Sequence, residues 1–170
     1  QKDNSAFKTQ LQHQSGEVIN DFGNDYEKIE NSLLADSNFF FSSLEVDHQF
    51  PFYLFSMDGE LLYWSAIDMV PEFTLLSTSR TYQILENNRG IYFTKLKKIQ
   101  RKDEDFWLLQ VYSFYDKVDV GNEYLKSGFN PEVFGNDRFL LSPDPKENYL
   151  DLYFDNQYLF SIFFRVGYDV

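Results

Sequence analysis

The N-terminal part of the chain has the hydrophobic spacing of an α-helix. Over residues 5–34, apolar side chains recur at intervals of three, four or seven positions. They are Phe7, Leu11, Val18, Phe22, Tyr26, Ile29 and Leu33. This spacing places them in one stripe of a helix, which we expect over residues 1–36. At 1.5 Å per residue the helix is about 45 Å long, so its polar first third is expected to project beyond the body of the domain, with Gly16 and Gly23 as the sites of any kink.

The rest of the chain has the alternating pattern of β-strands. Residues 50–65 form two apolar runs about the turn Met57-Asp58-Gly59, which is typical of a hairpin. Further strands are expected at 81–85, 91–99, 106–115, 138–141, 149–154 and 158–166. Residues 39–41 and 116–127 break the alternation and favour short helical turns. Together these elements predict an α+β domain, in which the long N-terminal helix packs on a roughly five-stranded antiparallel sheet within residues 50–166 that carries a short helical insert.

One face of this sheet is expected to remain open. A single helix covers one face only, so the opposite face is available for a ligand. On the strand at 91–99, Lys95 and Lys97 point to the same side because side chains alternate along a strand. We expect that side to be exposed to solvent.

Composition narrows the class of partner. The 170 residues suit a single domain and include no cysteine, which excludes disulfides and thiolate sites. With 27 acidic against 15 basic residues the formal charge is −12, which argues against nucleic acid or an anionic membrane surface as the main ligand. The 19 Phe, 12 Tyr and 2 Trp residues leave two interpretations open: the filling of a β-rich core, or an aromatic-lined ligand pocket.

The chain shows no motif for catalysis, for a metal or for a cofactor. His13 and His48 lie far apart and lack metal-binding spacing, so each is expected to be a solvated or capping residue. No GxSxG, GxGxxG or P-loop sequence occurs. Asp116, Asp119 and Glu123 do not follow the spacing of a calcium loop and are typical of a solvated acidic helix face. We therefore expect a binding or signalling module and not an enzyme.

Four stretches, taken in order, resemble the extracytoplasmic sensor domain of membrane-bound bacterial histidine kinases, of the Cache or PAS-like type. They are LFSMDGELLYWS (54–65), NRGIYFTKLKKI (88–99), LLQVYSFYDKVDVGNEYLKSGFNP (108–131) and YLFSIFF (158–164). The chain departs from the family pattern directly after Trp64-Ser65, where Ala66-Ile67-Asp68 stands in place of a polar residue and asparagine. We expect any ligand site to differ from its relatives at this point.

The resemblance implies a single periplasmic sensor domain, residues 1–170, belonging to an inner-membrane histidine kinase. Membrane helices would flank the domain, so that Gln1 and Val170 lie near the membrane. The parent protein would phosphorylate a histidine other than His13 or His48 and signal to a cytoplasmic response regulator. It would also form a homodimer through the stripe of the N-terminal helix.

The signal itself stays open between a small molecule and a protein. The alternatives to a ligand sensor are a non-catalytic exported interaction module, which predicts an exposed aromatic patch without a cavity, and a domain that senses divalent cations through its acidic surface. From the matching stretches, the candidate ligand-binding residues are Trp64, Ser65, Tyr92, Tyr115 and Asn122. For each of them a fold-holding hydrogen-bonding role is the stronger interpretation, because buried Trp and Tyr polar groups need partners.

Overall fold

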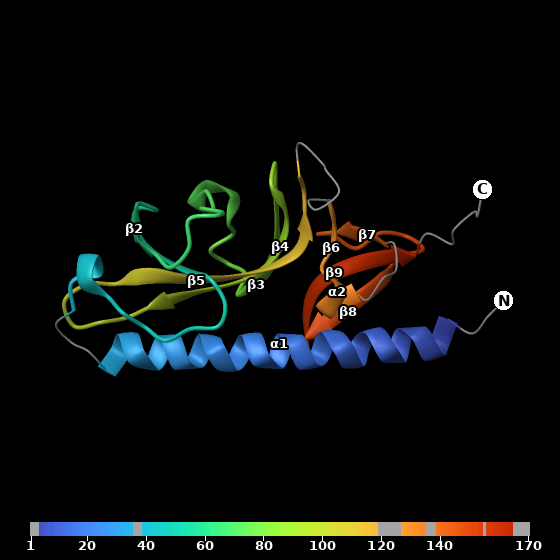
Figure 1. Ribbon diagram of the computed structural model, residues 1–170, viewed down its shortest axis with the longest axis horizontal. Coiled ribbons are helices and arrows are strands. Elements are labelled where there is room, and N and C mark those ends of the chain that lie inside the picture. Colours follow the sequence, from blue (N-terminus) through green and yellow to red (C-terminus); the bar gives the residue numbers. More distant parts are fainter. Residues whose placement is uncertain (1–3, 36–38, 119–126, 135–138, 155, 165–170) are drawn as a thin grey trace.

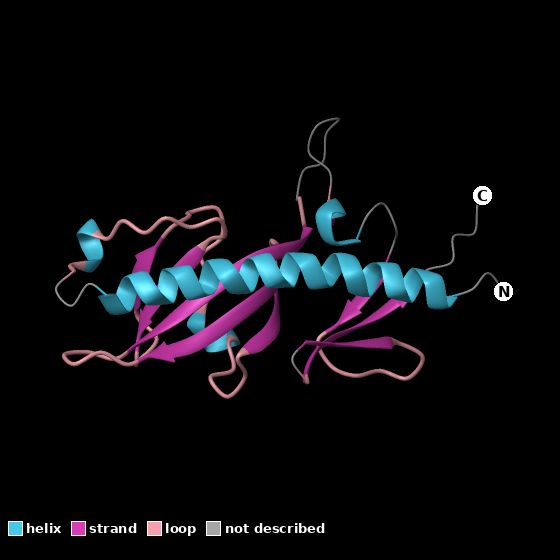
Figure 2. Cartoon of the chain, turned by 90° about the horizontal axis from the view of Figure 1, so that it is seen from below, coloured by secondary structure: helices cyan, strands magenta, loops and turns pink. Residues whose placement is uncertain are grey.

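The computed structural model describes residues 4–35, 39–118, 127–134, 139–154 and 156–164. Helix α1 (Asn4–Ala35) confirms the long N-terminal helix and runs without interruption through Gly16 and Gly23. Its N-terminal half lies alongside a second sheet, where its length had led us to expect a projecting end (Figures 1 and 2). Among the described helices, none combines the length and the apolar character needed to cross a bilayer.

The main sheet is antiparallel, as predicted, and has the strand order β2-β1-β5-β4-β3, with β6 paired to the end of β5. Its strands are β1 (Phe52–Ser56), β2 (Leu61–Trp64), β3 (Tyr82–Asn87), β4 (Gly90–Ile99), β5 (Phe106–Asp116) and β6 (Gly128–Phe129). The expected hairpin forms between β1 and β2, and Gly59 in its turn has a φ of 87°, which a residue without Cβ adopts freely. The sheet therefore follows the strand pattern of the sequence closely.

The last three strands form a sheet of their own instead of extending the main one. They are β7 (Phe139–Ser142), β8 (Leu150–Phe154) and β9 (Gln157–Phe164), in the order β7-β9-β8. An alternating pattern defines a strand but not its partner, which is why the sequence did not separate the two sheets. The described short helices are α2 (Pro131–Phe134) and two 3-10 turns, η1 (Phe41–Ser43) and η2 (Phe73–Leu75). Most of the insert expected at 116–127 lies outside the described residues.

Both faces of the main sheet are covered. On one face α1 inserts Tyr26, Ile29 and Leu33 against residues of β1 and β5. On the other face the segment between β2 and β3 lays Met69 and Leu76 over the sheet, so the open face expected from the sequence is closed (Figure 1). Many of the aromatic side chains fill the resulting core, and several phenylalanines and tyrosines are less than 2% exposed.

The side of β4 that carries Lys95 and Lys97 is covered by α1, so the expectation of solvent exposure is wrong for Lys95, whereas the Lys97 side chain remains 40% exposed. Both point toward α1, where Lys95 is 8% exposed and Lys97 pairs with Glu30 at 2.9 Å. Alternation correctly placed the two lysines on one side of β4, but only the packing of the helix decides which side is covered. The stem of a lysine is apolar enough to lie in such a layer.

Candidate functional site

A cavity of about 920 Å³ opens beside one edge of β5. It lies where the segment that is hydrogen-bonded to this edge of the strand gives way to another segment. Along this edge Val111 still bonds to Pro51 before β1, whereas the carbonyls of Ser113 and Phe114 accept hydrogen bonds from Asn130 after β6. The cavity occupies the interval between these two partners. Its lining residues come from five parts of the chain: 49–53, 66–69, 88–92, 111–118 and 132.

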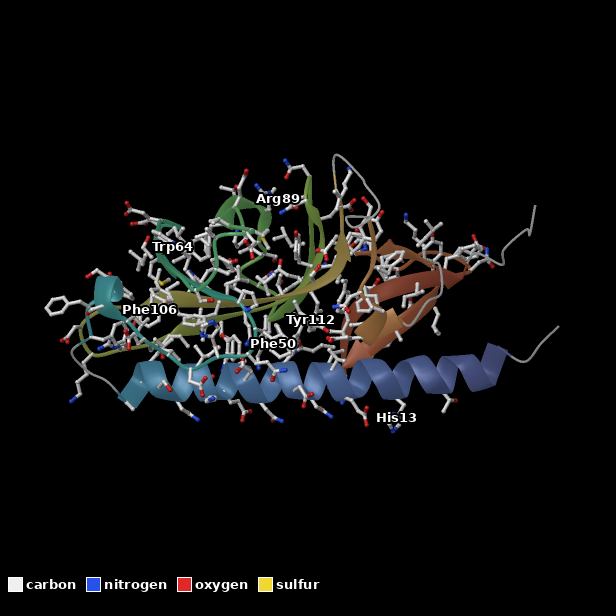
Figure 3. All side chains as sticks on the ribbon, viewed as in Figure 1. His13, Phe50, Trp64, Arg89, Phe106 and Tyr112 are labelled. Atoms are coloured by element: carbon white, nitrogen blue, oxygen red, sulfur yellow. The ribbon has the colours of Figure 1, made fainter. Side chains whose placement is uncertain are left out.

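The cavity reaches around the edge of β5 from one face of the sheet to the other. Successive residues of a strand point to opposite faces, and Val111, Tyr112 and Ser113 all line the cavity. Tyr112 packs on the side of α1, with its ring centroid 5.0 Å from that of Phe50. Figure 3 shows Phe50 and Tyr112 close to α1 and Arg89 on the far side of the main sheet. The site thus connects the outer loops of the sheet with the layer that holds the helix.

One side of the cavity is apolar, and a tyrosine hydroxyl holds it in place. Tyr53 is 1% exposed, and its hydroxyl donates to the carbonyl oxygen of Met69 in the loop after β2. Burial, together with the nearby Asp68, raises the pKa of Tyr53 to about 12, so the hydroxyl remains a donor at neutral pH. This bond ties the loop that carries Ala66 and Asp68 to the sheet.

The polar wall carries charges of both signs. The cations are Arg89, whose guanidinium donates to the Asp68 carbonyl, and Lys117. The carboxylates are those of Asp68, Asp116 and Glu132. Opposed charges above an apolar base allow the site to orient a small polar ligand.

Two tyrosines bring hydroxyl groups to this wall. The Tyr112 hydroxyl donates to Glu132 at 2.9 Å, and burial together with that carboxylate raises the pKa of Tyr112 to about 12. Tyr92 also lines the cavity, and among the described residues its hydroxyl has no hydrogen-bond partner. Burial and Asp116 raise the pKa of Tyr92, while Arg89 lowers it. The Tyr92 hydroxyl is therefore available to a ligand.

Of the five candidate ligand-binding residues, the structure places Tyr92 in the cavity. The Ser65 hydroxyl accepts a hydrogen bond from the Phe52 amide at 2.8 Å and joins the ends of β1 and β2. Trp64 is 49% exposed on β2, and the Tyr115 ring packs on Phe129. None of these three lines the cavity, and Asn122 lies outside the described residues.

Several cavity residues carried no signal as site residues in the sequence. Arg89 was part of a turn, and Phe50 and Tyr112 were part of an aromatic-rich background. Ala66 does line the cavity, at the position where the chain departs from the family pattern, whereas the neighbouring Ile67 is 77% exposed. The departure from the family pattern at Ala66 was therefore the strongest indication of this part of the cavity in the sequence.

The described part of the chain contains no group of three or more His, Asp or Glu side chains arranged to hold a metal ion. His48 bonds through Nδ1 to the Val46 oxygen at 2.8 Å, and His13 is an exposed helix residue 3.8 Å from Glu17. Asp119 and Glu123 lie outside the described residues. Comparisons with protein families, with curated proteins and with solved structures find no match to the chain.

Proposed function

We propose that this chain is the extracytoplasmic ligand-sensing domain of a membrane-bound sensor histidine kinase, and that the cavity beside β5 is its ligand site. The observation that carries the proposal is the cavity itself. Its volume of about 920 Å³ lies within the usual size range of small-molecule sites, and it joins an apolar base to a few converging polar groups. The wall of Tyr92 and residues 111–118 comes from two of the four stretches that resemble the sensor family.

The arrangement of α1 supports a relay. This helix runs beside both sheets, so a shift of the cavity walls against the helix changes its position relative to the rest of the domain (Figure 2). On the family resemblance, flanking membrane helices would carry that shift to the kinase and its response regulator. Coupling free energies of about 1–3 kcal/mol change an output from several-fold to a hundred-fold, so a small shift suffices.

A homodimer through α1 would not use the described part of the apolar stripe that we predicted for it. Phe22, Tyr26 and Ile29 of the apolar stripe are at most 1% exposed, because they pack on the chain's own sheets. The outward face of the same helix is polar, with Asp21, Asn24 and Lys28 among its residues. A dimer of kinases would therefore pair these polar faces.

One observation favours the interaction module as a second candidate. Ile67, Val70 and Leu75 are 77%, 47% and 53% exposed and border a common hollow of about 250 Å³ next to the turn between β3 and β4. The interaction module was expected to lack a cavity, however, and a small-molecule cavity lies beside this hollow. Ligand binding therefore takes precedence in our proposal.

A thermal-shift screen tests the proposal. The panel contains neutral, anionic, cationic and zwitterionic metabolites, with calcium and magnesium at constant ionic strength, and hits are quantified by calorimetry. We expect at least one small molecule to bind, Ala66→Trp to block it, and Tyr92→Phe to weaken it by about two- to tenfold through the loss of one hydrogen bond. Tyr115→Phe is the matched control, because Tyr115 lies outside the cavity lining.

The contrary outcomes are equally specific. Binding that survives Ala66→Trp places the ligand elsewhere on the domain. If Tyr92→Phe and Tyr115→Phe lower the melting temperature equally and leave every ligand response intact, the cavity is not the ligand site. A response to calcium or magnesium alone would favour the cation-sensing alternative.

A further inference from the structure

A single carboxylate on α1 holds the wall of the cavity. Asp25 is 7% exposed and accepts three hydrogen bonds from residues remote in sequence. The amides of Gln49 and Phe50 donate to its two oxygens at 2.9 Å each, and the Gln110 side-chain amide donates at 2.7 Å. Gln49 and Phe50 line the cavity, so the backbone of that wall is bonded directly to the helix.

Ring contacts reinforce the same connection. The Phe50 centroid lies 5.4 Å from that of Phe22 on α1 and 5.0 Å from that of Tyr112 on β5. Phe22 and Tyr112 are themselves 6.4 Å apart. Phe50 therefore packs between the helix and the cavity and cannot move without disturbing one of these two neighbours.

The hydrogen bonds make the connection stiff. A backbone N–H that loses its buried acceptor costs about 1–3 kcal/mol, and bonds to a carboxylate are stronger than neutral ones. When the segment at Gln49 and Phe50 shifts, keeping both bonds to Asp25 requires the helix to follow. Breaking them would leave two backbone donors without their acceptor and the Asp25 carboxylate with the Gln110 amide alone.

We propose that Asp25 is a positioning residue that couples the cavity to α1. A ligand that displaces Phe50 moves the two amides bonded to Asp25, and the helix moves with them. This inference rests on the proposed function of the cavity as a ligand site. It assigns the regulation of that site to a residue that touches no ligand and lies on the element expected to carry the signal.

The test replaces the unidentified ligand by a side chain. Ala66→Trp fills the cavity from the loop after β2, and Ile67→Trp adds the same ring at the adjacent exposed position. Each change is made in the unaltered chain, in Asp25→Asn and in Asp21→Asn. Asp21 is an exposed α1 residue one turn earlier, so its replacement matches the charge change without touching the cavity wall. Hydrogen–deuterium exchange of α1 amides over residues 16–31 is the readout.

We expect Ala66→Trp, but not Ile67→Trp, to change the exchange rate of these amides by at least about fivefold, the lower end of ordinary coupling between sites. The same response should persist in Asp21→Asn and fall below about twofold in Asp25→Asn. A full response in Asp25→Asn overturns the proposal. So does the lack of any response to Ala66→Trp in the otherwise unaltered chain.

Second variants keep the test decisive. If Ala66→Trp does not fold, Val118→Trp fills the cavity from the segment after β5, and the same outcomes apply. If Asp25→Asn does not fold, Asp25→Glu keeps the charge but displaces the carboxylate by one methylene. This test uses no ligand, so its failure is distinguishable from failure of the proposed function. A ligand screen without hits argues against the cavity as a ligand site and leaves the coupling intact. If a ligand binds but the exchange response to Ala66→Trp is as large in Asp25→Asn as in the unaltered chain, only the coupling through Asp25 is overturned.

Discussion

The Nζ atom of Lys95 lies 4.3 Å from the centroid of the Tyr26 ring, inside the layer between α1 and the main sheet. The ring of Tyr82 lies 5.4 Å from the same atom. Burial lowers the pKa of Lys95, as does the neighbouring Lys97, while Glu30 and Glu27 raise it. The helix therefore packs on a buried cation that lies against two aromatic rings.

Replacing this cation by an apolar side chain of similar length should stabilise the domain. We expect Lys95→Met to raise the free energy of unfolding by about 1 kcal/mol at neutral pH, because the desolvation of the charge is removed. Urea denaturation measures the change. The control is Lys98→Met on the outward face of β4, where the surface pair with Asp105 contributes about 0–1 kcal/mol. A lower free energy of unfolding in Lys95→Met would mean that the contacts of Lys95 with Tyr26 and Tyr82 outweigh the cost of burying its charge.

Alkaline pH should destabilise the fold through its buried tyrosines. The pKa values of Tyr53 and Tyr112 rise from 10.0 to about 12, with burial as the main cause. Between these values the unfolded chain has lost protons that the folded chain retains, so the free energy of unfolding falls as pH rises from 10 to 12. Urea titrations across this range should show a shallower fall in Tyr112→Phe. If the free energy of unfolding falls as steeply with pH in that variant, the raised pKa of Tyr112 in the folded chain is contradicted.

The hydroxyls of Tyr53 and Tyr92 should differ in their contribution to stability. Tyr53→Phe leaves the buried Met69 carbonyl without its donor, and we expect a loss of about 1–2 kcal/mol. Tyr92→Phe removes a hydroxyl that has no partner among the described residues, so its effect should stay within about 0.5 kcal/mol. Urea denaturation at neutral pH compares the two. Equal losses would show that the Tyr92 hydroxyl holds the fold and is not reserved for a ligand.

Gly90, at the start of β4, should tolerate no larger residue. A Cβ atom there would lie 2.0 Å from the Tyr115 carbonyl oxygen, which belongs to the backbone and cannot rotate away. We expect Gly90→Ala to cost about 3 kcal/mol in urea denaturation, because one of the two strands must shift. In Gly128→Ala the new Cβ meets no atom within 4 Å, so this control should lose less than about 1 kcal/mol. Similar losses in both variants would contradict this steric explanation.

The parts of the fold that depend on local pattern were predictable. The stripe from Val18 to Leu33 indicated α1, and the alternation of residues 91–99 and 106–115 indicated β4 and β5 to within a residue at each end. These patterns express the turn of a helix and the pleat of a strand, which each segment imposes by itself. The same patterns could not show that the last three strands leave the main sheet.

The candidate site was less accessible from the sequence. Tyr92 was singled out because it lies in a stretch with a family resemblance, and it does line the cavity. Asp25 carried no such signal, because its significance arises from bonds to Phe50, 25 residues away, and to Gln110, 85 residues away. Contacts between residues so far apart in the chain cannot be predicted from the spacing of side chains within one segment.

The sequence by itself determined the long helix, most of the strands, and the acidic, cysteine-free character of the domain, because these follow from side-chain period and composition. Only the tertiary structure decided that Lys95 faces the helix, that the segment around Met69 closes the outer face, and that a cavity wraps the edge of β5. Each of these depends on which surfaces cover one another. Burial is a property of contacts between segments, and no segment carries it alone.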